Sequence, residues 1–293
     1  MTVPNQRGPP VESTPWFAWA HLFDPHDPYD APEQYVSEPY DNEVAFTDAA
    51  LGRFFARLRQ AGLLDNTVVI VTAAHGEGLG EHGELPHTLF AYDTTLRVPL
   101  IIAGPGIAPA VRDVPVSHVD LLPTMLDLLA LDPPAGLAGR SLRMELSANT
   151  PVPLIYIEAL NANLTRNWAP LTGIVANRWK FIDLPIPELY DLQADPDEMT
   201  NVFVQQAAQA GRMQADLAPL KTLGASASDR VTLDSEVEAR LRVLGYTASR
   251  VGRQPLEQVY TEADDPKTQL DVHLAWREAV SYTHLTLPTN REV

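Results

Sequence analysis

Short apolar segments alternate with amphipathic ones through the first half of the chain. The segment 67–72 is β-branched throughout and lies between turn formers, which predicts a buried strand of a parallel sheet. The apolar runs 15–23 and 98–103 predict two further strands. Between the runs 15–23 and 67–72, apolar residues recur at helical spacing over 43–62. This strand–helix–strand order predicts an α/β fold with a mostly parallel sheet flanked by helices.

The pattern changes near the middle of the chain. Ser117 and Asp120 have the spacing of a capping box, which predicts a helix over 119–131. Beyond Pro133, short β-branched and aromatic runs predict a small C-terminal α+β subdomain with antiparallel strands. Its expected strands are 154–158, 171–176 and 179–182, followed by helices at about 204–220, 234–244 and 268–280.

The composition restricts the chemistry that this chain can perform. Its formal net charge is −17 and it contains no cysteine. An acidic chain without basic clusters is a poor ligand for nucleic acid or anionic lipid. The lack of cysteine excludes thiolate nucleophiles, thiolate metal sites and disulfides. No apolar run approaches the ~20 residues of a membrane span, and the first ten residues lack the apolar core of a signal peptide. We therefore expect no nucleic-acid partner and no transmembrane segment.

Five of the eight histidines gather after two of the expected strands. They are His21 and His26 at the end of the first apolar run, and His75, His82 and His87 in the glycine-rich loop after 67–72. Because parallel α/β sheets bind ligands at the carboxyl ends of their strands, we expect both groups at one site. His26 and His75 are the stronger candidates, and a solvated surface position is the alternative for each. The loop acids Glu77, Glu81 and Glu84 are expected only to solvate the loop. The spacing is not the HExxH of a zinc protease.

Several motifs, in order along the chain, resemble those of the sulfatases in the alkaline phosphatase superfamily. The sequence His-Gly-Glu-Gly-Leu-Gly-Glu-His-Gly-Glu at 75–84 resembles the second metal-binding segment of that family, and Glu-Leu-Tyr-Asp-Leu at 188–192 resembles its C-terminal subdomain. The other matching segments are 21–29, 40–44, 96–102 and 116–124. The resemblance implies an alkaline-phosphatase-like α/β fold and a sulfuric ester hydrolase. Its implied partner is the sulfate ester of a small molecule or a glycan.

The same resemblance implies cofactors and site residues. Sulfatases use a formylglycine, made from Cys or Ser, as nucleophile and a divalent cation, usually calcium, as Lewis acid. By this resemblance His75 is a metal ligand. His26 is a catalytic residue that faces the substrate, and His87 is a catalytic residue that contacts the sulfate and assists the leaving group. A periplasmic, extracellular or membrane-associated location is also implied.

Two departures from the family pattern weaken these expectations. Ala74 stands where the family has a metal-binding aspartate, and a methyl group cannot coordinate a cation. No Cys or Ser stands in a matching nucleophile motif, so we expect an N-terminally truncated bacterial sulfatase-like protein that is inactive as a fragment and binds metal weakly or not at all. The alternatives are a phosphodiesterase, phosphonate hydrolase or phosphoethanolamine transferase of the same superfamily, or a non-catalytic sulfatase-like binding protein.

The expected organisation follows from these motifs. We expect a linker at 1–14, followed at 15–150 by the C-terminal part of the sulfatase-like α/β domain, which is incomplete at its N-terminus. The small subdomain is expected at 151–222 and a helical tail at 223–280. Residues 281–293 are expected to be a non-native tail, because they resemble translated vector sequence.

Overall fold

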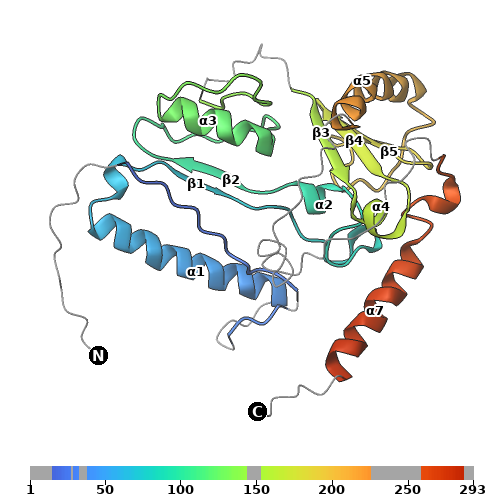
Figure 1. Cartoon of the computed structure of the whole chain (residues 1–293), viewed down its shortest axis with the longest axis horizontal. Helices are drawn as coiled ribbons and strands as arrows, with labels where there is room; N and C mark the ends of the chain where they lie inside the picture. Colours follow the sequence, from blue (N-terminus) through green and yellow to red (C-terminus); the bar gives the residue numbers. More distant parts are fainter. Residues whose placement is uncertain (1–14, 28, 33–37, 144–152, 226–258, 287–293) are drawn as a thin grey trace. The chain divides into compact units, whose positions relative to one another are not determined.

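The computed structural model describes residues 15–27, 29–32, 38–143, 153–225 and 259–286 (Figure 1). The chain divides into two compact units, residues 1–67 and 68–293. The expected helix at 234–244 lies outside the described residues. None of the helices in the described part of the chain is long and apolar enough to cross a membrane.

The first unit is built on one long helix. Helix α1 spans Pro39–Gln60, and its first residue is a proline, which suits the first turn because the missing N–H has no partner there in any case. The expected strand at 15–23 is wrong. This segment forms neither helix nor strand, and the aromatic side chains of Trp16, Phe17 and Trp19 are exposed. Strands are stabilised by hydrogen bonds to a neighbour, and none of the described strands pairs with it.

The second unit begins with a two-stranded sheet. Strand β1 (Val69–Thr72) pairs with β2 (Leu100–Ala103) at the positions expected for strands, but the pairing is antiparallel. The parallel pairing expected from the apolar pattern is therefore wrong for these strands, and every strand pair that the structure describes is antiparallel. A parallel pair needs a crossover, usually a helix, whereas the helical turns between β1 and β2 are only η2 (Glu81–Gly83) and α2 (Asp93–Leu96).

A four-stranded antiparallel sheet follows, which confirms the antiparallel character expected for the second half. Its order is β3 (Ile155–Ala159), β4 (Leu171–Ala176), β5 (Trp179–Asp183) and β6 (Glu188–Asp191), and α4 (Asn161–Arg166) connects β3 to β4. Strand β6 was not expected from the apolar pattern. It coincides with the Glu-Leu-Tyr-Asp motif, whose buried residues include a glutamate.

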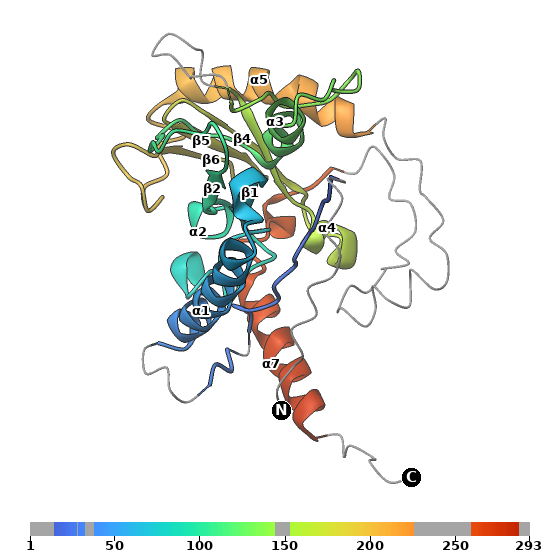
Figure 2. The ribbon, with the colours of Figure 1, turned by 90° about the vertical axis from the view of Figure 1, so that its left-hand side faces the viewer.

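Both faces of this sheet are covered. On one face, Ile174, Phe181 and Leu189 pack against Ala210, Met213 and Leu217 of α5 (Ala207–Ala225), which lies along the sheet in Figure 2. On the other face, Ile157, Leu171, Ile182 and Tyr190 pack against the buried segment 89–92. This alternation is the period of two that a strand imposes, and it fixes the loop that ends at 89–92 to the sheet.

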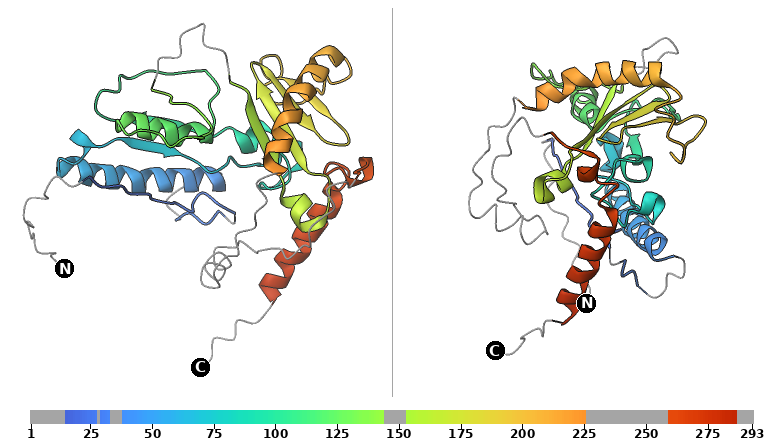
Figure 3. Two further views of the ribbon diagram at one scale, coloured as in Figure 1. Left: turned by 45° about the horizontal axis from the view of Figure 1, so that its top comes forward. Right: turned by 90° about the vertical axis from the view of Figure 1, so that its right-hand side faces the viewer.

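The remaining helices agree with the expected positions but not with all boundaries. The capping box of Ser117 and Asp120 is present in η3 (His118–Asp120), and α3 spans Leu121–Leu128. After η4 (Glu262–Asp264), α7 runs from Leu270 to Thr286 and lies beside α4 (Figure 3). Helix α7 thus continues past residue 280, where the expected helix ends. The expected domain boundaries stay predictions.

Candidate functional site

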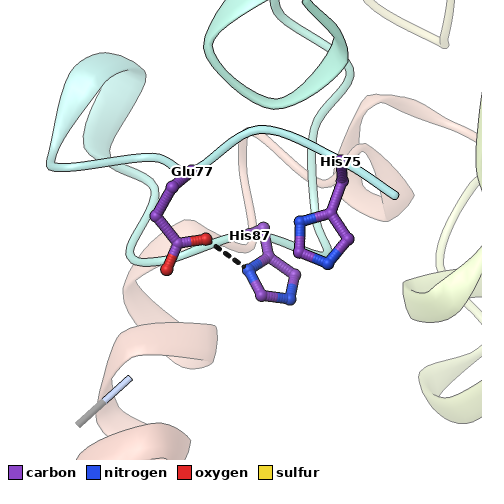
Figure 4. Close-up of side chains that lie close together, drawn as sticks. All are labelled: His75, Glu77 and His87. Carbon is purple, nitrogen blue, oxygen red and sulfur yellow. Dashed lines mark hydrogen bonds and ion pairs between the residues drawn. The ribbon is translucent and has the colours of Figure 1, made fainter. Parts of the chain in front are cut away.

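The loop between β1 and β2 brings three side chains of the sequence motif together. His75, Glu77 and His87 offer ligand atoms that all lie within 4.8 Å of one another (Figure 4). The rings of His75 and His87 are tilted by 34° with their centroids 4.0 Å apart. His87 Nδ1 is 2.8 Å from Glu77 Oε2. Two of the three histidines expected to form the site are therefore neighbours.

The partners of the two rings constrain which nitrogen carries hydrogen. His75 Nδ1 lies 2.8 Å from the Gly76 carbonyl oxygen. A carbonyl only accepts, so Nδ1 donates and Nε2 keeps its lone pair in a neutral ring. His87 Nδ1 donates to the Glu77 carboxylate in the same way. The Glu77 side chain is only 5% exposed and that of His87 18%, whereas His75 is exposed.

Glu77 is the residue whose role was missed. Expected to solvate the loop, it is instead largely buried and paired with His87. The position of Glu77, two residues after His75, is the sequence feature that could have indicated its role. The turn that directs Glu77 toward His87 is not visible in the residue pattern.

Two glycines make that turn possible. The Gly76 N–H donates to the Thr95 carbonyl oxygen at 2.8 Å, and the Gly78 N–H donates to that of Pro86 at 2.5 Å. A Cβ on Gly76 would lie 2.1 Å from the Thr94 carbonyl oxygen, and one on Gly78 would lie 2.6 Å from that of Pro86. No side chain fits at either position, so the sequence of the loop requires glycine at both.

Glu84 also differs from the expected solvated acid. It is 2% exposed, and its Oε1 accepts the N–H of Leu89 at 2.5 Å and that of Phe90 at 3.3 Å. Burial raises the pKa of Glu84, and these backbone hydrogen bonds oppose the rise. Glu84 therefore anchors the end of the loop that carries His87.

His82 lies apart from the other two histidines of the loop. Its ring stacks on Tyr92, with a centroid distance of 3.7 Å and an interplanar angle of 17°. Burial lowers the pKa of His82, against the opposite effect of Glu188. This environment favours the neutral ring as a packing element.

His26 belongs to the first unit, in a loop held by one buried carboxylate. Glu43 of α1 is 4% exposed, and it accepts the N–H of His26 at 2.8 Å and that of Asp30 at 2.6 Å. His26 Nδ1 lies 2.6 Å from the Asp27 carbonyl oxygen. Glu43 lies in the matching segment 40–44 but had no assigned role. The expected approach of His26 to His75 and His87 stays a prediction.

The donor set in the second unit does not fit calcium. Calcium takes six to eight oxygen ligands, whereas the group formed by His75, Glu77 and His87 offers one carboxylate and two imidazoles. Ala74, directly before His75, adds no oxygen from its side chain.

Comparisons with solved structures identify the class of fold. BT4656, solved in complex with its substrate D-glucosamine-2-N,6-O-disulfate, is 27% identical with a TM-score of 0.54, over 65% of this chain and 42% of that one. Phosphonate monoester hydrolase of Agrobacterium radiobacter is 27% identical with a TM-score of 0.50, over 64% and 41%. The fold is that of the alkaline-phosphatase-like hydrolases, which confirms the expected α/β class.

Sequence comparisons find similarity to sulfatases. The sulfatase family model matches residues 10–131, and the model of the C-terminal part of N-sulphoglucosamine sulphohydrolase matches 80–222. Arylsulfatase K of Bos taurus is 38% identical over 54% of this chain, and choline-sulfatase of Rhizobium meliloti (strain 1021) is 31% identical over 75%. Together the two models match residues 10–222, so this part of the chain is similar to sulfatases. The chain spans 31% of the length of that arylsulfatase K and 44% of that choline-sulfatase.

Proposed function

We propose that this chain is part of a sulfuric ester hydrolase and supplies the residues on the leaving-group side of its site. The pairing of His87 with Glu77 at 2.8 Å carries this proposal. The carboxylate accepts the Nδ1 hydrogen and fixes the ring, so that the imidazolium can donate its Nε2 hydrogen to the departing ester oxygen. His26 is the proposed second contact to the sulfate.

The proposed substrate is a sulfate ester of a small molecule or of a sugar. The complex of BT4656 with a disulfated glucosamine supports the sugar, and the likeness to choline-sulfatase supports the small molecule. The 6-O-sulfate of that sugar and a choline sulfate ester each have an alcohol leaving group, which needs a proton far more than a phenol does. A general acid at His87 suits either.

This chain is proposed not to hydrolyse sulfate esters by itself. In sulfatases, a formylglycine derived from Cys or Ser attacks sulfur with help from a divalent cation, usually calcium. This chain contains no cysteine, Ala74 replaces a ligand, and the donor set around His75 does not fit calcium. No step of the proposed chemistry of His87 depends on the ion.

Binding and turnover test the two parts of the proposal separately. In 15N-histidine NMR spectra, we expect 4-nitrophenyl sulfate to shift the Nε2 signal of His87, and we expect the purified chain to release no 4-nitrophenol. His118→Ala is the control, since His118 is exposed at the start of η3. A sulfate ester that leaves the His87 ring signals unchanged would contradict the assigned role, and measurable release would contradict the inactivity.

A second candidate is hydrolysis of phosphonate monoesters, favoured by the likeness to the Agrobacterium radiobacter enzyme. A phenyl phosphonate monoester in the same titration distinguishes the two. If it shifts the His87 signals at lower concentration than the sulfate ester does, the second candidate replaces the first.

A further inference from the structure

We propose that His75, Glu77 and His87 form a binding site for a divalent cation of the Zn²⁺ type. The ligand atoms of these three side chains already lie within 4.8 Å of one another. A tetrahedral zinc ion with bonds of about 2.0–2.1 Å holds its ligand atoms about 3.3 Å apart. The three groups therefore need only small side-chain rotations to reach one ion.

The ligand types select the class of ion. Two imidazoles and one carboxylate, with an open fourth position, make a characteristic set for zinc, whereas calcium and magnesium prefer all-oxygen shells. The proposed site thus departs from the calcium site that the sulfatase resemblance implies. It uses Glu77 and His87, which that resemblance does not place among the metal ligands.

The hydrogen bond of His75 prepares it as a ligand. Its Nδ1 donates to the Gly76 carbonyl oxygen at 2.8 Å, which leaves the lone pair on Nε2. Histidine ligands in metalloproteins commonly donate the other ring hydrogen to a carbonyl or carboxylate, because this fixes the ring and its tautomer.

The pair of Glu77 and His87 holds a proton that the ion would replace. His87 Nδ1 and Glu77 Oε2 are 2.8 Å apart with a hydrogen between them. On binding, the ion takes the place of this hydrogen on Nδ1 of the imidazolium, one nitrogen–metal and one oxygen–metal bond form, and one proton is released to solvent, while the ring, now neutral, keeps its hydrogen on Nε2. Glu77 is 5% exposed, so little water competes for its carboxylate.

The backbone keeps the ligands in place without the ion. The Gly76 and Gly78 N–H groups are bonded to carbonyls of the returning chain, and Glu84 fixes the backbone just beyond His87. Preorganisation of this kind lowers the ordering cost of binding. The site goes beyond the proposed hydrolytic function: an ion on Nδ1 of His87 prevents the ring from becoming an imidazolium, so an occupied site would block the role of His87 as an acid.

Metal titrations of the purified chain test this site without any ester. We expect Zn²⁺ to bind one per chain in calorimetry, more tightly than Ca²⁺ or Mg²⁺, and Co²⁺ to give the intense visible bands of a four-coordinate ion. The variants His75→Ala, His87→Ala and Glu77→Gln should each weaken Zn²⁺ binding at least about tenfold, whereas His118→Ala should bind as the parent does.

Two results would overturn the proposal. One is tighter binding of Ca²⁺ than of Zn²⁺, and the other is equal Zn²⁺ affinity in the three ligand variants and His118→Ala. Glu77→Gln keeps the size of the side chain and an acceptor for His87, so it decides the question if either histidine variant fails to fold. Because no sulfate ester is present, failure here leaves the proposed hydrolase function to its own test.

Discussion

In the first unit, Glu43 is a buried carboxylate on α1. It satisfies two backbone N–H groups, of His26 and Asp30, in a loop rich in proline and aspartate. Hydrogen bonds to an ionised group contribute more than neutral ones, roughly 1.5–3 kcal/mol. Glu43 therefore positions the backbone of His26.

Replacing Glu43 tests this positioning role. In Glu43→Gln, the amide hydrogens of His26 and Asp30 should exchange with solvent about tenfold faster, because one of the two acceptor oxygens becomes an NH2 donor and the other loses its charge. Amide exchange followed by NMR measures the effect. Asp48→Asn, at an exposed position of the same helix, should leave both rates unchanged, and equal rates in all three proteins would contradict the role.

At the scale of single residues, the sequence predicted which histidines belong to the site better than it predicted which residues they contact. His75 and His87 could be expected because they follow a β-branched strand and match a family motif. The pairing of Glu77 with His87 could not, because it depends on two backbone hydrogen bonds that fold the loop back at Gly76 and Gly78. The residue types show which side chains can bind or react, whereas the direction of a glycine turn depends on the chain segments around it.

At the level of elements, glycine has opposite effects on stability in the loop after β1 and in helix α1. A Cβ at Gly76 would lie 2.1 Å from the Thr94 carbonyl oxygen, whereas one at Gly52, on an exposed position of α1, meets nothing within 4 Å. Gly76→Ala should lower the free energy of unfolding by about 1–3 kcal/mol. Gly52→Ala should raise it by up to ~1 kcal/mol because alanine favours the helix. Urea titrations followed by circular dichroism measure both, and effects of the same sign would contradict this account.

The strands show where local pattern is insufficient. The apolar runs at 67–72 and 98–103 were correctly expected as strands, since β-branched residues favour extended backbone. Their direction was not, because direction depends on the connection, and only one-turn helices lie between β1 and β2. The run at 15–23 has the composition of a strand but no strand partner among the described residues. The residue types favour an extended backbone, but a sheet forms only where a neighbouring strand can pair with it.

Helix α7 is joined to α4 by a cluster around one arginine. The Arg166 guanidinium lies over the rings of Trp168 and Trp276, at 5.1 and 4.7 Å from their centroids, and its Nη1 donates to His273 Nδ1 at 2.9 Å. Burial, helped by the charges of Arg166 and Arg277, lowers the pKa of His273 to about 4. The neutral ring is therefore the form that fits this contact.

This contact should make stability depend on pH. Between the unfolded pKa of 6.5 and the folded value of about 4, the unfolded chain binds a proton at His273 that the folded chain does not. The free energy of unfolding should therefore fall as the pH drops through this window, by up to about 3 kcal/mol. His273→Gln should flatten that slope in urea titrations at several pH values, and His118→Ala should retain it. An unchanged slope in His273→Gln would refute the assignment.

Over the second unit as a whole, buried charge connects the loop of the site to the four-stranded sheet. Lys180 of β5 is completely buried and lies 2.5 Å from Asp93 Oδ1 and 2.6 Å from Glu198 Oε1. Glu198 also accepts the Asp93 N–H at 2.6 Å. Burial raises the pKa of Glu198, and Lys180 opposes that rise. Within a chain of net charge −17, this lysine supplies the counter-charge to two carboxylates beneath the loop.

Removing Lys180 should therefore destabilise far more than removing a lysine at the surface. Lys180→Met leaves two carboxylates without a counter-charge and should lower the free energy of unfolding by about 3–5 kcal/mol. Lys221→Met breaks the exposed pair with Asp183 and should cost no more than ~1 kcal/mol. Adding Asp93→Asn and Glu198→Gln to Lys180→Met should recover part of the loss, because the uncompensated charges are then gone. Urea titrations give all three values. Equal losses in the two lysine variants would mean that the network contributes only packing. The loop bearing His87 would then be attached to the sheet by the apolar contacts of segment 89–92 and by the hydrogen bond of Tyr92 to Glu188.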